Sequence, residues 1–315
     1  MTRYVEERRG SFGVEPVCRV LGVAMSTFYA RRSRKPSRRE LRDRELVAAI
    51  HAARAGYRRV YGVRKTWKEL KRRGVEVGRD RVGRLMRQQG LEGVRRGKRK
   101  RTTIPDEAAL ERARDLVQRD FSATRPNEKW VADITYVRTW QGFCYLAFIL
   151  DVYSRAIVGW QLASHMRTEL VLDALEMANG LRRPAEGLVA HSDRGSQYTS
   201  IRYTERLDEL GIAPSVGSRG DALDNAMAEA WVATYKSELV AGRRFPGFEH
   251  AEHETLHWIG FYNEERLHEE LGDVPPAEYE RNYDAKHRPF GPVEAGQPAL
   301  TKGALAGLDG RMSRR

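Results

Sequence analysis

Residues 128–152 read EKWVADITYVRTWQGFCYLAFILDV, and this stretch decides the fold. Residues 128–137 alternate between apolar and polar side chains, which is typical of a strand with one buried face. Residues 142–152 contain an unbroken apolar run, which is typical of a strand buried on both faces. Short turns join these strands to each other and to a third strand at 156–162. We therefore expect the three strands to form an antiparallel meander.

The chain after the meander alternates between helix and strand patterns. We expect helices at 168–181, 200–210 and 221–240 and short strands at 187–191 and 212–216. Three strands followed by helix, strand, helix, strand and helix is the order of a ribonuclease-H-like α/β fold. The sequence therefore predicts such a core at 126–240, with a helical extension at 241–283 and a tail at 284–315.

The charge is divided unevenly along the chain. The 315 residues carry a formal net charge of +13. Residues 1–100 hold 30 Lys and Arg against 10 Asp and Glu, whereas the other 215 residues hold 26 against 33. A basic front end joined to a mildly acidic body favours a module that binds a polyanion, and nucleic acid is the polyanion that we expect.

Cysteine usage and hydropathy exclude several classes of protein. Cys18 and Cys144 are the two cysteines of the chain and have no CxxC spacing, so a disulfide framework and a cysteine zinc site are excluded. The longest apolar run, at 143–150, is too short to cross a membrane. Residues 1–7 lack the apolar segment of a secretory signal. We expect a cytoplasmic protein with no membrane partner.

The first of two helical units that precede the core lies at 1–36. An apolar stripe of Val17, Val20 and Leu21 runs to Gly22, and Ser26 is placed to cap a second short helix. This outline is that of a helix-turn-helix. A basic linker is expected at 31–39.

The second helical unit lies at 40–98, and a further linker is expected at 99–125. Its apolar stripes recur at helical spacing, and its polar faces consist almost entirely of Arg and Lys. Basic side chains on exposed helix faces are the usual source of phosphate contacts. The candidates for DNA binding in this unit are Arg64, Lys65, Arg84 and Arg87.

Three carboxylates stand where the predicted core would bring them together. Asp133 lies in the middle of an apolar strand, where an acidic side chain is costly unless it is paired or binds a metal. Asp193 follows the fourth strand, at the edge where ligands of open α/β sheets usually gather. Glu229 lies in the last helix, and Lys236 follows on the same face, about 10 Å along the axis. Three such carboxylates can hold two divalent metal ions, with Mg²⁺ or Mn²⁺ favoured over zinc.

The spacing and surroundings of these residues resemble a known family. Asp193 and Glu229 are separated by 35 residues, and Lys236 follows two helical turns later. The phrases WVADITY (130–136), DVYSR (151–155), HSDRGSQY (191–198) and DNA (224–226) accompany them. The chain resembles the DDE transposases of the third insertion-sequence family (OrfB type), whose catalytic core is similar to that of retroviral integrases. Asp273 departs from the family pattern, in which an aromatic residue is usual after Leu-Gly.

The resemblance implies an enzyme that cuts the ends of an insertion sequence and joins the freed 3′-hydroxyl to target DNA. Asp133, Asp193 and Glu229 would bind two Mg²⁺ ions, for which Mn²⁺ is expected to substitute, and Lys236 would contact the DNA end. The resemblance further implies a homo-oligomer on DNA, the upstream first-frame product as a fusion partner, and a location at the bacterial nucleoid.

Other interpretations of these residues remain open. A ribonuclease-H-like nuclease or resolvase would share the core, and a DNA-binding regulator without catalysis would share the basic helices. The HExxH pattern at 253–257 has the spacing of zinc ligands, but it lies in a charged segment typical of a solvated helix face. The tripeptide RGD at 219–221 is expected to form a loop and helix cap. We interpret Asp151 as a structural carboxylate that pairs with Arg155.

Overall fold

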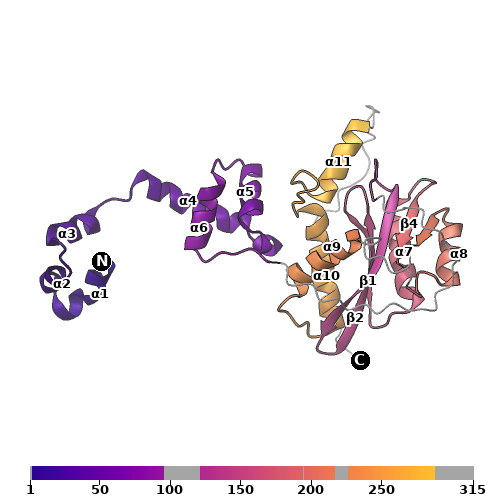
Figure 1. Cartoon of the computed structure of the whole chain (residues 1–315), viewed down its shortest axis with the longest axis horizontal. Helices are drawn as coiled ribbons and strands as arrows, with labels where there is room; N and C mark the ends of the chain where they lie inside the picture. Colours follow the sequence, from indigo (N-terminus) through magenta and orange to yellow (C-terminus); the bar gives the residue numbers. More distant parts are fainter. Residues whose placement is uncertain (1, 96–120, 194, 217–225, 288–315) are drawn as a thin grey trace, which may run out of the picture.

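The computed structural model describes residues 2–95, 121–193, 195–216 and 226–287. It places two small helical units in front of an α/β core (Figure 1), so the predicted fold class is confirmed. Most of the predicted linker at 99–125 lies outside the described residues, as do the RGD tripeptide, the predicted start of the last helix at 221 and the tail from 288. Within the described residues, no helix combines the length and apolar content that a membrane span requires.

The N-terminal unit contains α1 (Thr2–Phe12), α2 (Val14–Val20) and α3 (Met25–Ser33). Gly22 turns the chain between α2 and α3 at φ +64°, a conformation that glycine adopts without strain. The helix-turn-helix outline is therefore present, but two details of its prediction are wrong. Val20 is 87% exposed, and Ser26 lies inside α3, whose N-cap is Ala24. The small core includes a residue of α1 instead and consists of Val5, Val17, Cys18 and Phe28.

The second unit, which we call the helical domain, contains α4 (Arg38–Ala53), a 3₁₀ turn (Gly56–Val60), α5 (Val63–Arg72) and α6 (Arg79–Gln88). A capping box begins α4, because the Ser37 hydroxyl accepts the Glu40 N–H and the Glu40 carboxylate accepts the Ser37 N–H. Only residues 34–37 separate α3 from α4, so the predicted linker at 31–39 is mostly helical. The predicted apolar stripes form the core, which includes Leu46, Ile50, Leu70, Val82, Leu85 and Met86.

The α/β core is built on a five-stranded sheet of order β3-β2-β1-β4-β5. Its strands are β1 (Lys129–Thr139), β2 (Gly142–Asp151), β3 (Ile157–Ala163), β4 (Val189–Ser192) and β5 (Ala213–Val216). The first three form the predicted antiparallel meander, and β4 and β5 extend the sheet in parallel with β1. All five predicted strands are present, and the mixed sheet is that of the ribonuclease-H-like fold.

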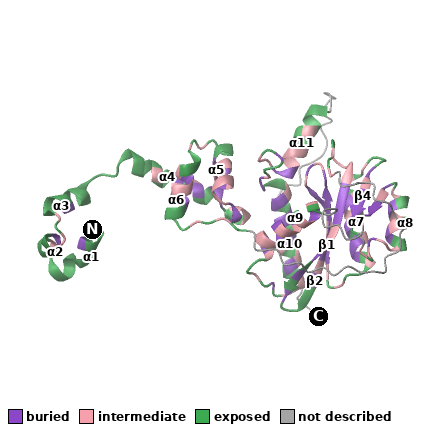
Figure 2. Ribbon diagram, in the orientation of Figure 1, coloured by how far each residue is buried: buried purple, intermediate pink, exposed green. Residues whose placement is uncertain are grey.

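Helices cover both faces of this sheet and bury it (Figure 2). One face packs against α7 (Thr168–Arg182) and α8 (Ile201–Glu209), and the other against α9 (Ala226–Tyr235) and α10 (Phe248–Glu264). A π-helical turn (Lys236–Val240) follows α9. The last described helix, α11 (Pro276–His287), continues past the predicted boundary at 283.

Helix α7 approaches the sheet unusually closely at Gly159 on β3. A Cβ atom at this position would lie 2.2 Å from the carbonyl oxygen of Ala174 and 2.8 Å from the Cβ of Ala178. Both contacts are far shorter than atoms tolerate, so only glycine fits between this strand and this helix.

Asp151 is structural, as predicted, but its predicted partner is wrong. Its buried carboxylate accepts hydrogen bonds from the Asn127 N–H at 2.7 Å, the Ser154 N–H at 2.8 Å and the Ser154 hydroxyl at 2.9 Å. The guanidinium of Arg155 pairs with Glu270 instead, at 3.5 Å. The tight turn after β2 supplies closer donors than a long side chain, so the carboxylate is satisfied without the arginine.

Candidate active site

The parallel pairing of β1 with β4 brings Asp133 and Asp193 together. Ala132 lies opposite Ser192 in this register, so the next residue on each segment is one of the two aspartates. Alternation along β1 places Asp133 on the same side as Val131, which packs in the core beneath α9. The sheet therefore presents both aspartates near the carboxyl end of β4, on the side that α9 covers.

Helix α9 and the turn after it supply the other two predicted residues. Glu229 lies in the first turn of α9, close enough to Asp133 for its charge to raise the pKa of that carboxyl. Lys236 begins the π-helical turn, and its Nζ lies 4.0 Å from the centre of the Tyr136 ring on β1. Lys236 also acts on Asp133, whose pKa it lowers. The fold thus gathers all four residues that the sequence singled out around one carboxyl group.

Burial and like charge make Asp133 difficult to ionise. Loss of water contact is the main cause that raises its pKa to about 7, and the carboxylates of Asp193 and Glu229 raise it further. Burial also raises the pKa of Asp193, although its side chain reaches the surface, and burial lowers the pKa of Lys236. A carboxyl group in these surroundings gains its charge most readily when a cation joins it.

The donor set fits a hard divalent cation, but the carboxylates are not closed around one point. Carboxylate oxygens are the ligands that Mg²⁺ and Mn²⁺ prefer. Asp133 Oδ1 accepts the Ile134 N–H at 2.7 Å, and Asp193 Oδ1 accepts the Gly195 N–H at 3.0 Å. Among the described residues, no three His, Cys, Asp or Glu side chains have an arrangement that could hold a metal ion. Closing the trio therefore requires side-chain movement, which mutual repulsion opposes unless a cation offsets it.

Two buried residues beside the aspartates were missed as site residues. Tyr198 is 3% exposed, and its hydroxyl has no hydrogen-bond partner among the described residues. Burial, followed by the charge of Asp133, raises the pKa of Tyr198 far above its usual value. His191 on β4 lies with its Nδ1 3.0 Å from Ser215 Oγ, and its charge lowers the pKa of Asp193. Both residues lie in the segment 191–198. Their place beside the aspartates could not be predicted, because a Tyr or His that only packs in the core gives the same sequence pattern.

The four basic residues of the helical domain that were predicted to bind DNA fall into two groups. Arg84 on α6 donates to Asp43 at 2.8 Å, and Arg87 is exposed near the end of the same helix. Arg64 and Lys65 on α5 lie against other parts of the protein. Arg64 pairs with carboxylates of the segment after α10, and the Lys65 Nζ lies 5.5 Å from the centre of the Tyr61 ring.

The HExxH pattern lies on α10, outside the carboxylate site. His253 and His257 contact each other, with 3.0 Å between their Nε2 atoms. No third His, Cys, Asp or Glu joins them as a metal ligand in the part of the chain that the structure describes. The pair therefore lacks the ligand set of a zinc site.

Comparison with known proteins identifies the family of the chain. The family model described as "Integrase core domain" matches residues 123–222, a second model of that description matches residues 210–276, and the model "HTH-like domain" matches residues 40–99. The transposase for insertion sequence element IS629 of Shigella sonnei is 47% identical over 290 residues, which are 90% of this chain and 97% of that protein.

Less similar proteins also match the chain. The transposase InsF for insertion sequence IS3A of Escherichia coli is 32% identical over 282 residues, 88% of this chain and 97% of the relative. The HTLV-2 integrase catalytic core domain, solved in complex with magnesium, aligns with a TM-score of 0.40 at 13% identity over 50% of this chain and 99% of its own. The two relatives named as transposases cover both domains of the chain. The chain therefore belongs to the DDE-type transposases of insertion sequence elements, the family of the IS3 transposase, enzymes that bind DNA and act in its transposition.

Proposed function

We propose that Asp133, Asp193 and Glu229 bind two divalent metal ions, Mg²⁺ with Mn²⁺ able to substitute, and that this site cuts the element ends and joins the 3′-hydroxyl to target DNA. The observation that carries the proposal is the convergence of Asp193, beside β1 in the parallel register, and Glu229, from α9, on the half-buried carboxyl of Asp133, whose pKa both of them raise. Perturbed carboxyl groups that converge in one site are typical of catalytic centres.

Different elements of the fold supply the residues of the proposed site. Asp133 and Asp193 come from adjacent parallel strands, so the sheet fixes their spacing, and Glu229 approaches from α9. These carboxylates would hold two divalent ions, which would supply activation of water or a hydroxyl and stabilisation of the leaving oxygen in an in-line attack on phosphorus. Cutting and joining differ only in the nucleophile, so one trio serves both. Lys236, held over Tyr136, contacts a phosphate of the DNA end.

The assembly around this site is also part of the proposal. Two element ends must be held at once, so we propose that two or more protomers act together on DNA. We further propose that the upstream first-frame product joins the chain as a fusion and that the protein works at the nucleoid in the cytoplasm. The basic helical units in front of the core favour this function over a nuclease that only hydrolyses, and the complete acidic trio favours it over a regulator without catalysis.

An excised element circle provides the test. Outward-facing primers within the gene give a PCR product only from a circle or a tandem copy. We expect a junction product from cells that express the wild type with the fused upstream frame, and none from Glu229→Gln, which removes one metal ligand. Glu205→Gln, at an exposed position on α8, should give the wild-type amount. A junction product of normal intensity from Glu229→Gln would show that this carboxylate has no part in the chemistry.

The raised pKa of Asp133 predicts how the joining rate depends on pH. Its carboxyl has a pKa of about 7 without metal, and a metal ligand must be ionised, so metal and proton compete. At limiting Mg²⁺, the joining rate should rise as pH passes through about 7, and the midpoint should move to lower pH as Mg²⁺ is increased. Initial joining rates over a grid of pH and Mg²⁺ concentration measure this shift. A midpoint that stays fixed at every Mg²⁺ concentration would separate Asp133 from metal binding.

A further inference from the structure

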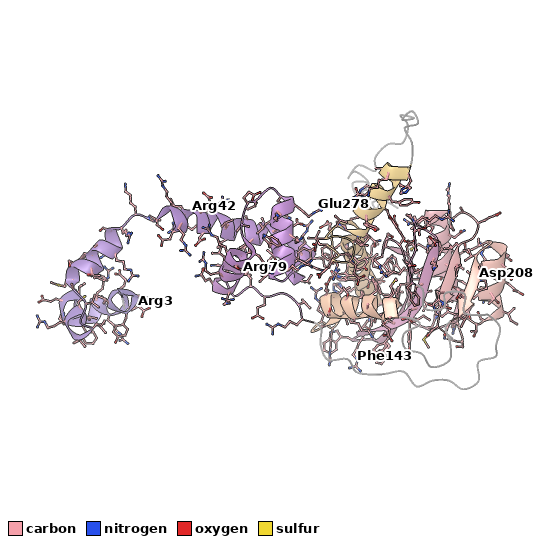
Figure 3. All side chains as sticks on the ribbon, turned by 45° about the horizontal axis from the view of Figure 1, so that its top comes forward. Arg3, Arg42, Arg79, Phe143, Asp208 and Glu278 are labelled. Atoms are coloured by element: carbon pink, nitrogen blue, oxygen red, sulfur yellow. The ribbon has the colours of Figure 1, made fainter. Side chains whose placement is uncertain are left out.

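The basic side of α5 faces the core and is neutralised there. Arg64 pairs with Glu269 at 2.6 Å and with Asp273 at 3.2 Å, and Lys68 pairs with Asp273 at 2.9 Å. Asp273, the residue that departs from the family pattern, thus holds two basic side chains of α5. The remaining pairs across this contact are Arg58 with Glu265 and Arg72 with Glu278, which Figure 3 labels on α11.

Apolar packing fixes the same surface. Tyr61 is 1% exposed, its hydroxyl accepts the Leu267 N–H at 2.9 Å, and it donates to the Glu265 carbonyl at 3.2 Å. The Tyr57 ring stacks on Phe261 of α10 with 5.7 Å between ring centres. We call this surface the α5 contact. The paired basic side chains stay partly exposed, so a DNA phosphate that approaches them must compete with the carboxylates that already hold them.

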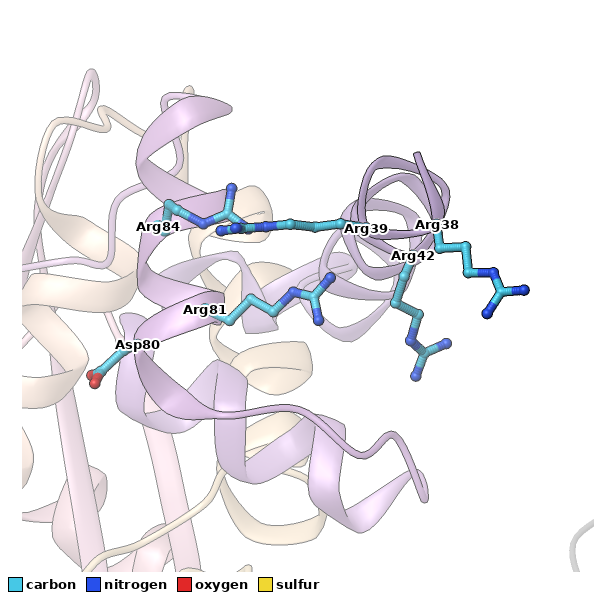
Figure 4. Close-up of a pocket in the computed structure, with 6 residues that line it drawn as sticks. All are labelled: Arg38, Arg39, Arg42, Asp80, Arg81 and Arg84. Atoms are coloured by element: carbon cyan, nitrogen blue, oxygen red, sulfur yellow. The ribbon is translucent and has the colours of Figure 1, made fainter. Parts of the chain in front are cut away.

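A second basic surface lies between α4 and α6, and we call it the arginine pocket. It is lined by Arg38, Arg39, Arg42, Asp80, Arg81 and Arg84. In the close-up, Arg39 and Arg84 point toward one another from the two helices, whereas Asp80 points away (Figure 4). Guanidinium groups that converge repel each other, and a bound anion offsets that repulsion.

The charges of the arginine pocket are only partly balanced. Asp43 fixes Arg81 and Arg84, each at 2.8 Å, and Arg42 pairs with Glu45 on the surface of α4. The side chains of Arg38 and Arg39 are exposed and form no hydrogen bond or ion pair with the residues that the structure describes. One carboxylate therefore orients two arginines of α6, while the arginines at the start of α4 keep their charge available.

We propose that the arginine pocket, and not α5, is the surface of the helical domain that binds the DNA backbone. The proposal deepens the proposed function by assigning the face that holds the DNA. Guanidinium groups bind phosphate in a planar, bidentate manner, and those of Arg81 and Arg84 are already oriented. The α5 contact uses the same residue types to fix the helical domain on the core, so Arg64 and Lys68 are positioning residues.

The test compares two variants that remove the same charge. Arg39→Ala/Arg42→Ala changes exposed positions on α4, where alanine keeps the helix. Arg64→Ala/Lys68→Ala changes the α5 contact. Binding of the full chain to a fluorescent DNA duplex of arbitrary sequence is followed by anisotropy over a series of salt concentrations. We expect the pocket variant to bind about 10-fold more weakly, with the slope of log K against log salt smaller by about 2. We expect the α5 variant to stay within about two-fold of the wild type but to melt at a lower temperature.

The outcomes separate the choice of surface from the function itself. If the α5 variant loses as much affinity as the pocket variant, or if the pocket variant binds normally, the arginine pocket is not the DNA surface, although the transposase function is unaffected. If the wild type binds no duplex in low salt, the result contradicts DNA binding by this chain, and with it the assignment of either surface.

Discussion

Asp133→Asn is expected to abolish DNA joining and, at the same time, to make the protein more stable at alkaline pH. Loss of one carboxylate of the proposed metal site should lower the joining rate by about 10³-fold or more. The amide oxygen of Asn can still accept the Ile134 N–H that Asp133 accepts, so the strand keeps this hydrogen bond. The variant therefore separates the effect of the carboxylate on the free energy of unfolding from its proposed role in catalysis.

The stability gain follows from the raised pKa. The Asp133 carboxyl ionises with a pKa of about 7 in the folded chain and near 3.9 when unfolded. Because the folded state holds the proton more tightly, the group penalises folding progressively as pH rises from about 4 to 7, and fully above that. Removing it should increase the free energy of unfolding by about 4 kcal/mol at pH 8, and by less than half of that at pH 5.

Thermal melts in EDTA at these two pH values measure the effect. Mg²⁺ should raise the melting temperature of the wild type and leave that of Asp133→Asn almost unchanged, since binding to the folded state stabilises it. Asp208→Asn, at an exposed position on α8 (Figure 3), serves as the matched control and should behave as the wild type does. A variant that melts below the wild type at pH 8 would contradict the electrostatic cost assigned to Asp133.

Gly159→Ala is expected to be the most damaging single-methyl change in the core. The added Cβ would lie 2.2 Å from the Ala174 carbonyl oxygen, and backbone atoms cannot rotate away as a flexible side chain can. Helix α7 must therefore move off β3 and lose packing along its length. We expect a loss of about 3 kcal/mol or more, which lowers the melting temperature by about 10 °C.

The same substitution at Gly180 is the control. Gly180 lies on α7 itself and is exposed, and a methyl group added there would meet no atom of the described residues within 4 Å. Alanine favours a helix over glycine by up to about 1 kcal/mol, so Gly180→Ala should leave the protein as stable or slightly more so. Soluble yield and thermal melts of the two variants test the contrast. If both variants melt alike, the close approach at Gly159 does not limit the fold.

The core and its acidic trio could be predicted from the sequence because both rest on local patterns. Alternation in 128–137 and the apolar run after it predicted the meander, and an acid inside a strand is conspicuous because burial makes it costly. The parallel register that sets Asp133 beside Asp193 depends on the order of strands, which the alternation of helix and strand predicted.

Features that depend on distant contacts could not be predicted. The core of the N-terminal unit uses Val5, which carries no periodic signal of its own, and so the exposure of Val20 was missed. Arg64 looks like any basic residue on a helix face, and only the fold shows that its carboxylates lie two hundred residues later. The unsatisfied hydroxyl of Tyr198 is likewise visible only once its neighbours are placed.

The burial of Tyr61 has a consequence for how the molecule can be divided. The helical domain has an apolar centre of its own, yet Tyr61 and Val60 belong to the large apolar cluster of the catalytic core. A fragment that ends before α10 would expose these side chains to water together with the unbalanced charges of α5. The two domains are separate in sequence but share this packing. We therefore expect the helical domain and the core to unfold together in one cooperative transition.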